Sequence, residues 1–155
     1  MTLRFLPSSV VLAIFFLDRV TKYLIQKKMV YGGSINLLPF FHITYVENTG
    51  AAFGLGQNQN TFFIVTAIAI LIVLFILDWR VQKENLRLKI GIALVIGGAL
   101  GNLYYRIAYG SVVDFLDFFI ATRHWPAFNL ADSSICIGAA LLVFSQWKIE
   151  EGKKL

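Results

Sequence analysis

Four stretches of apolar residues constrain what this chain can fold into more than any other feature. They run over residues 10–24, 62–77, 90–104 and 134–147. A helix needs about 20 mostly apolar residues to span a bilayer, and each stretch reaches that length with its flanking residues. The predicted helices then cover residues 10–26, 61–78, 89–107 and 133–148. We expect a membrane α-helical protein with four transmembrane helices, in a single domain over residues 1–155.

The composition supports this class of protein and excludes an ordinary soluble domain. Of the 155 residues, 57% are hydrophobic and 15% charged, and the mean hydropathy is +0.69. No small-residue cleavage site occurs after the apolar residues that precede Asp18 in the first stretch. We therefore expect this stretch to be retained as a membrane anchor. The single cysteine, Cys136, excludes a disulfide within the chain.

The net charge of +5 comes from basic residues that cluster on one side of the predicted membrane. Lys27 and Lys28 lie on the opposite side. Eight of the fourteen basic residues share the first side: Arg4, Arg80, Lys83, Arg87, Lys89, Lys148, Lys153 and Lys154. Positive charge favours the cytoplasmic side, so both termini and the 78–89 loop are predicted to be cytoplasmic. This placement indicates a lipid bilayer as partner, and no nucleic acid.

A segment between the first two helices differs from a simple loop. Residues 42–46 are rich in β-branched and aromatic side chains, and residues 48–50 form a turn pattern. We therefore expect a small extracytoplasmic β-cradle over residues 35–58. On the third helix, Ala93, Gly97 and Gly101 place a small residue at every fourth position, a pattern that favours close helix packing in lipid.

Carboxylates beside apolar segments are the strongest functional signal, since the chain has only nine Asp and Glu residues. Asp114 is surrounded by apolar residues, and Asp132 precedes the last apolar stretch. Taken singly, Asp114 fits a loop residue that reaches water, Asp132 fits a helix cap, and Asp117 is a third candidate. Two close carboxylates in a low dielectric share a proton, which is what acid–base chemistry on a water molecule needs. The pattern predicts an intramembrane aspartyl peptidase.

Other polar residues can support such a pair. Asp18 and Lys22 are four residues apart, so they predict either an exposed ion pair or an organised polar end of the bundle. Asn48, Asn102 and Asn129 are amides that can hold a carboxylate or a peptide carbonyl, and Asn129 or a backbone N–H is a candidate donor to a tetrahedral oxyanion. Arg106 shares a helix face with Asn102.

Two other site classes lack their sequence signals. His42 and His124 have no ligand-spaced partner, which argues against zinc, and the chain has no Gly-x-Ser-x-Gly motif. We expect no metal and no organic cofactor.

Five motifs in this order resemble those of the bacterial lipoprotein signal peptidases, the type II signal peptidases of the inner membrane. They are LDRVTK (17–22), VENTGAAFG (46–54), GGALGNL (97–103), GSVVDF (110–115) and FNLAD (128–132). The resemblance implies four transmembrane helices, both termini in the cytoplasm, and an active site at the periplasmic face. It also implies an aspartic endopeptidase that cuts diacylglyceryl-modified prolipoproteins just before the lipidated cysteine.

The resemblance also assigns roles to residues and suggests partners. Asp114 and Asp132 become the catalytic pair, and Asp117 does not. The substrate-binding or supporting positions are Asp18, Lys22, Asn48, Asn102, Arg106 and Asn129. Beyond prolipoproteins, the implied partners include cyclic peptide antibiotics of the globomycin type, and the protein is expected to be a monomer.

One residue departs from the family pattern. Tyr105 stands before Arg106, where the family usually has Asp, so we expect altered support of Arg106 and reduced stability or activity. Two alternatives remain open from the residues: a catalytically impaired homologue that binds acylated peptides, and a small membrane transporter subunit that uses Asp18, Lys22 and Arg106.

Overall fold

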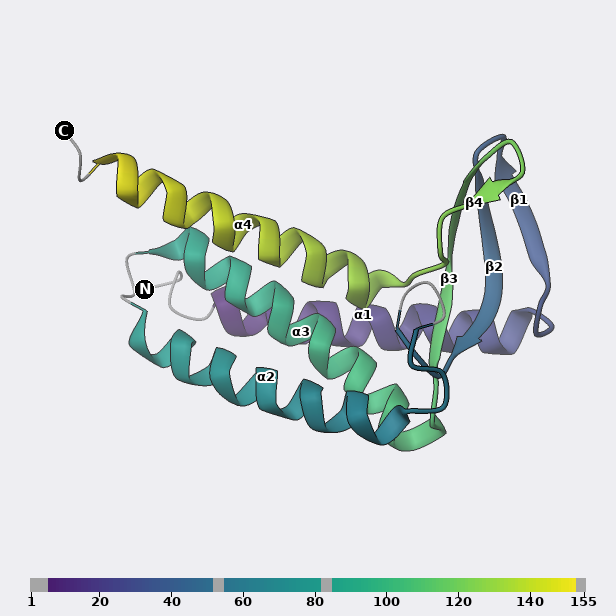
Figure 1. Cartoon of the computed structure of the whole chain (residues 1–155), viewed down its shortest axis with the longest axis horizontal. Coiled ribbons are helices and arrows are strands. Elements are labelled where there is room, and N and C mark those ends of the chain that lie inside the picture. Colours follow the sequence, from purple (N-terminus) through teal and green to yellow (C-terminus); the bar gives the residue numbers. More distant parts are fainter. Residues whose placement is uncertain (1–5, 52–54, 82–84, 153–155) are drawn as a thin grey trace.

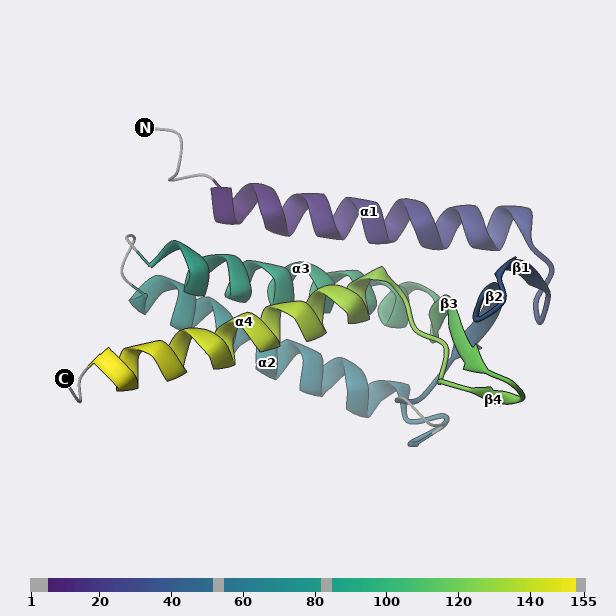
Figure 2. The same ribbon diagram turned by 90° about the horizontal axis from the view of Figure 1, so that it is seen from above.

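The structure, a computed structural model, describes residues 6–51, 55–81 and 85–152 and contains four helices in this part of the chain. They are α1 (Leu6–Lys28), α2 (Asn60–Arg80), α3 (Leu86–Tyr109) and α4 (Leu130–Gly152). The helices run side by side, and α1 begins at the same end of the bundle at which α4 finishes (Figure 1, Figure 2). The four predicted helices are confirmed as helices. Each is longer than predicted, because polar residues continue a helix beyond the apolar stretch that hydropathy detects.

Two helices, α2 and α3, are long and apolar enough by length and composition to cross a bilayer. The outer surface of α2 is almost entirely apolar, with Phe62, Ile72 and Phe75 each more than half exposed. An exposed apolar surface of this extent is typical of contact with lipid. In α1, the charges of Asp18, Arg19 and Lys22 lower the hydropathy, and α4 is apolar over Leu130–Ser145.

The central helix is α3, which packs against α1, α2 and α4. Its glycines let the neighbouring helices approach closely. A Cβ atom at Gly97 would lie 2.9 Å from the Cβ of Ile14 on α1, and one at Gly98 would overlap the carbonyl oxygen of Ala131 on α4. At Gly101 the added atom would meet the carboxylate of Asp18. The predicted packing role of the small-residue face is confirmed for Gly97 and Gly101, and it brings the polar residues of α1 next to α3.

A four-stranded antiparallel sheet lies across one end of the helix bundle (Figure 1). Its strands, in spatial order, are β1 (Ser34–Leu38), β2 (Phe41–Asn48), β3 (Val112–Ile120) and β4 (Arg123–His124). The predicted cradle is correct for β1 and β2 but wrong in extent. Residues 49–51 and 55–58 form bends and turns, residues 52–54 lie outside the described part, and half of the strands come from the segment after α3.

Strand β3 carries Asp114 within the sheet, so the view of this residue as a loop carboxylate is wrong. The register between β2 and β3 slips by one residue between Ile43 and Val46. At this slip, the adjacent N–H groups of Phe115 and Leu116 both donate to the carbonyl oxygen of Phe128, at 3.0 and 2.8 Å. The irregularity breaks the strict alternation of a strand. For that reason, alternation of polar and apolar residues in the sequence could not reveal β3.

Candidate active site where sheet and helices meet

Asp114 is held in β3 by two side-chain amides. Its Oδ1 accepts a hydrogen bond from Nδ2 of Asn129 at 2.7 Å, and its Oδ2 accepts one from Nδ2 of Asn48 at 3.0 Å. The residue is only 3% exposed. Both of these donors are uncharged amides, so the two hydrogen bonds bring no positive charge to the carboxylate.

Asp132 lies in the first turn of α4 and forms a reciprocal cap with Asn129. The backbone N–H of Asn129 donates to Oδ2 of Asp132 at 3.2 Å, and the backbone N–H of Asp132 donates to Oδ1 of Asn129 at 2.9 Å. This is the arrangement of a capping box, which satisfies N–H groups that a helix start leaves without partners. Asn129 therefore bonds to both Asp114 and Asp132 and brings the two predicted catalytic residues together.

The remaining oxygen of Asp132 is bonded from α3. Its Oδ1 accepts from Nδ2 of Asn102 at 2.7 Å, while Oδ1 of Asn102 accepts from Nζ of Lys22 at 2.7 Å. The ammonium of Lys22 can only donate, so the amide oxygen of Asn102 faces it. The amide nitrogen of Asn102 therefore faces the carboxylate of Asp132. The oxygens of Asn48 and Asn129 are likewise occupied by backbone N–H groups. All three amides thus present N–H groups to the aspartates.

Asn129 itself is completely buried, and its side-chain amide is engaged with Asp114 and the backbone of Asp132. Its position therefore supports the two aspartates. The role of Asn129 or a backbone N–H as donor to an oxyanion stays a prediction.

Asp18 and Lys22 form an ion pair on α1, with 2.8 Å between Oδ2 and Nζ. Both side chains are fully buried, so the expectation of an exposed pair is wrong and that of an organised polar end is confirmed. Oδ1 of Asp18 accepts from the backbone N–H of Ala131 at 3.0 Å, which attaches α1 to the start of α4. Removing one member of such a pair leaves an uncompensated buried charge, although the intact pair adds little net stability.

The surroundings of Asp114 alter its acidity. Burial, and then the nearby charge of Asp132, raise the pKa of Asp114 to about 7, although the hydrogen bonds from Asn48 and Asn129 act in the opposite direction. A carboxyl group with this pKa exchanges its proton near neutral pH, as acid–base catalysis requires.

Arg106 lies at the sheet end of α3 and contacts the loop after β2. Its Nη2 donates to the carbonyl oxygen of Gly50 at 2.6 Å and its Nη1 to Oδ1 of Asn60 at 3.4 Å. Tyr105 faces elsewhere: it is 1% exposed, and its hydroxyl donates to Oε1 of Gln26 at 3.2 Å. The expectation that Tyr105 alters the support of Arg106 is therefore wrong. Asn60 and Gln26 were missed because both lie outside the five motifs that resemble the family.

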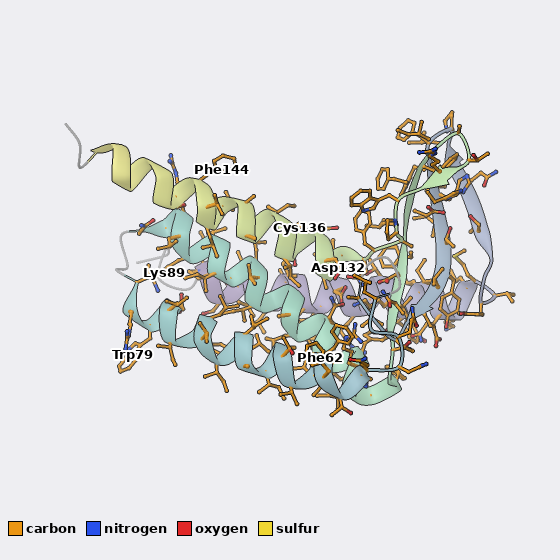
Figure 3. The ribbon with its side chains drawn as sticks, in the orientation of Figure 1. Phe62, Trp79, Lys89, Asp132, Cys136 and Phe144 are labelled. Carbon is orange, nitrogen blue, oxygen red and sulfur yellow. The ribbon has the colours of Figure 1, made fainter. Side chains whose placement is uncertain are left out.

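Two cavities adjoin the aspartates. The first, of about 470 Å³, is lined by Asp114 and Asp132 together with residues of α3 and α4, among them Arg106 and Cys136. The second, of about 430 Å³, lies on the sheet and also reaches Asp114. Figure 3 shows Asp132 and Cys136 near the sheet end of α4, and Trp79 and Lys89 at the far end of the bundle.

Asp117, the third candidate, does not join this pair. Its carboxylate contacts His124, with Nδ1 at 2.8 Å from Oδ1, and accepts from the hydroxyl of Thr44 at 3.2 Å. The structure thus separates the three aspartates that spacing alone could not separate. No group of three or more metal-ligating side chains suited to a metal ion occurs within the described ranges.

Comparison with known proteins gives the family. Residues 10–148 match the family model of signal peptidase (SPase) II. The lipoprotein signal peptidase of Alteromonas mediterranea is 47% identical over 140 residues, covering 86% of this chain and 76% of the relative. That of Halothermothrix orenii is 44% identical over 143 residues, covering 92% and 95%.

Solved structures agree with this result. A bacterial membrane enzyme determined by the in meso method at 2.3 Å resolution superposes with a TM-score of 0.89 at 37% identity, covering 95% of this chain and 90% of that one. A second, at 1.9 Å resolution, has a TM-score of 0.82 at 38% identity, covering 90% and 91%. The chain belongs to the signal peptidase II family and is a membrane protein with a small antiparallel sheet.

Proposed function

We propose that this protein is an aspartic endopeptidase that removes the signal peptide from diacylglyceryl-modified prolipoproteins, cutting before the lipidated cysteine. The observation that carries the proposal is the double role of Asn129, which donates from its side chain to Asp114 and from its backbone to Asp132. Membership of the signal peptidase II family supports the same reaction.

In the proposed mechanism, Asp114 and Asp132 share one proton and hold a water molecule between them. The ionised member takes a proton from the water as its oxygen attacks the scissile carbonyl carbon. The protonated member donates to the carbonyl oxygen and, as the tetrahedral intermediate collapses, a proton passes to the leaving amine. Asn48, Asn102 and Asn129 position the carboxylates, and Lys22 acts through Asn102.

The proposed placement in the bacterial inner membrane has all four helices spanning the bilayer, in a single domain over residues 1–155. Both ends of the chain then face the cytoplasm, and the sheet lies at the periplasmic face. Charges cluster at the helix ends opposite the sheet, where Trp79 and Lys89 lie (Figure 3), and this supports the orientation. The aspartates then reach water at the outer surface, while the diacylglyceryl chains remain in lipid. We also propose that the enzyme acts as a monomer and that cyclic peptides of the globomycin type occupy its active site.

The test is a gel-shift cleavage assay with purified protein in detergent. The substrate is a diacylglyceryl-modified prolipoprotein, run beside the same prolipoprotein without lipid. We expect the parent to cleave the lipidated form and Asp132→Asn to cleave neither form. Cleavage of the lipidated form by Asp132→Asn at the parent rate would contradict the assignment of the pair. Binding without cleavage by the parent would identify the catalytically impaired homologue.

A further inference from the structure

The cavity on the sheet contains polar side chains that the proposed proton chemistry does not use. Thr44 and Val46 of β2 form part of its wall, and Asp117 and His124 lie in it beyond Asp114. It shares Asn48, Asp114 and the segment 125–127 with the cavity that holds both aspartates. The two cavities therefore adjoin each other at Asp114.

The irregular pairing of β2 with β3 explains why this cavity includes both Asp114 and Asp117. Residues three apart on a regular strand face opposite sides of the sheet. Here Asp117 pairs with His42 and Asp114 pairs with Val46, so three steps along β3 match four steps along β2. Both carboxylates line the cavity together with Thr44 and Val46. One face of β3 thus joins the catalytic pair to the cluster around Asp117.

His124 is held in a defined orientation. Its Nδ1 lies 2.8 and 3.0 Å from the two carboxylate oxygens of Asp117. Its ring stacks on Phe119, with 5.0 Å between centroids and 19° between planes. An ionised carboxylate only accepts, so Nδ1 carries the hydrogen, and Nε2 is the ring atom that can bind a ligand. The side chain is 49% exposed, which leaves it accessible from the cavity.

The two cavities suit different parts of one polypeptide. The first cavity includes residues of α3 and α4, near which an apolar signal peptide would lie in the membrane. The second cavity includes the hydrogen-bonding side chains of Thr44, Asp117 and His124 on the sheet, at one end of the bundle, and these suit a segment leaving the membrane. We infer that this second cavity binds the residues that follow the lipidated cysteine, with His124 contacting them and Asp117 as its positioning residue. This inference rests on the proposed function.

Two substrates and two matched variants test the inference. The long substrate is a diacylglyceryl-modified prolipoprotein, and the short one ends in an amide at the lipidated cysteine. His124→Gln removes the ring in the cavity. His42→Gln is the control, because His42 also lies near Asp117, with Nδ1 at 3.9 Å from its Oδ2, but is not part of the cavity wall.

We expect His124→Gln to raise KM for the long substrate about three- to tenfold, the loss of one hydrogen bond, with kcat within twofold. The short substrate should show no change. Asp117→Asn should shift KM for the long substrate in the same direction, through loss of the Nδ1 contact.

Other outcomes overturn the inference. One is that His124→Gln changes KM equally for both substrates, and another is that it changes KM for neither. The third is that His42→Gln raises KM for the long substrate as much as His124→Gln does. Failure of the parent to cleave either substrate would instead overturn the proposed function, and this inference with it.

Discussion

Two aspartates on the same strand, three residues apart, lie in different surroundings. Both are buried, Asp114 at 3% exposure and Asp117 at 7%. In the described part of the chain, Asp114 accepts hydrogen bonds from amides and connects inward, through Asn129, Asp132 and Asn102, to the helices. Asp117 is bonded by a hydroxyl and a histidine, both of which belong to the sheet. Burial alone therefore does not distinguish the two aspartates, whereas the nature of their hydrogen-bond partners does.

The largest expected effect separates these two aspartates directly. Asp114→Asn removes the group that exchanges a proton, so we expect kcat to fall about a thousandfold or more. Asp117→Asn should cost only severalfold in kcat/KM, mainly through KM. The measurement is cleavage of the lipidated prolipoprotein, with Asp78→Asn at the far end of the bundle as an unaffected control. Comparable losses of kcat in both strand variants would abolish the distinction.

The next effect concerns the inward connection of Asp114. Lys22→Met leaves Asp18 as an unpaired buried charge and removes the donor to Asn102. We expect a loss of about 3–5 kcal/mol in the free energy of unfolding, measured by denaturant titration in detergent. Tyr105→Phe is the matched control, since Tyr105 is equally buried but donates only to Gln26. It should lose about 1 kcal/mol. Equal losses would show that Lys22 contributes no more than an ordinary buried polar group.

The last effect is the pH dependence of stability that Asp114 introduces. Its pKa is raised to about 7 in the folded state and returns to about 4 in the unfolded chain. Between about pH 4 and about pH 7, the carboxyl group of Asp114 loses its proton in the unfolded state but keeps it in the folded state. The stability that this group contributes is therefore complete below about pH 4 and is lost as the pH rises to about 7. Above that pH, the free energy of unfolding no longer depends on this group's titration. The loss is at most about 4 kcal/mol.

Asp114→Asn should remove this slope. The measurement is the free energy of unfolding of parent and variant from pH 4 to pH 8. If both proteins show the same slope, the raised pKa does not belong to Asp114.

The sequence predicted the four helices and singled out Asp114 and Asp132 as candidates, because both have local signals. Apolar stretches mark the helices, and a rare carboxylate in an apolar segment is visible without a fold. It could not predict that Asn129 bonds to Asp114 and Asp132, since this depends on β3 meeting the start of α4. Nor could it show that Tyr105 faces Gln26, because the direction of a side chain on α3 depends on how α1 packs against it.

The register slip between β2 and β3 has a consequence for how this part of the chain can vary in length. An insertion or deletion between Asp114 and Asp117 would change the count of residues that places both carboxylates on one side of the sheet. One carboxylate would then face away from the cavity, although every side chain of the site were still present in the sequence. At the hairpin tip, where Ala121 connects β3 to β4 with a φ of 52°, added residues would leave this count intact. Variation in length is therefore expected to be tolerated at the tip and rejected between the two aspartates.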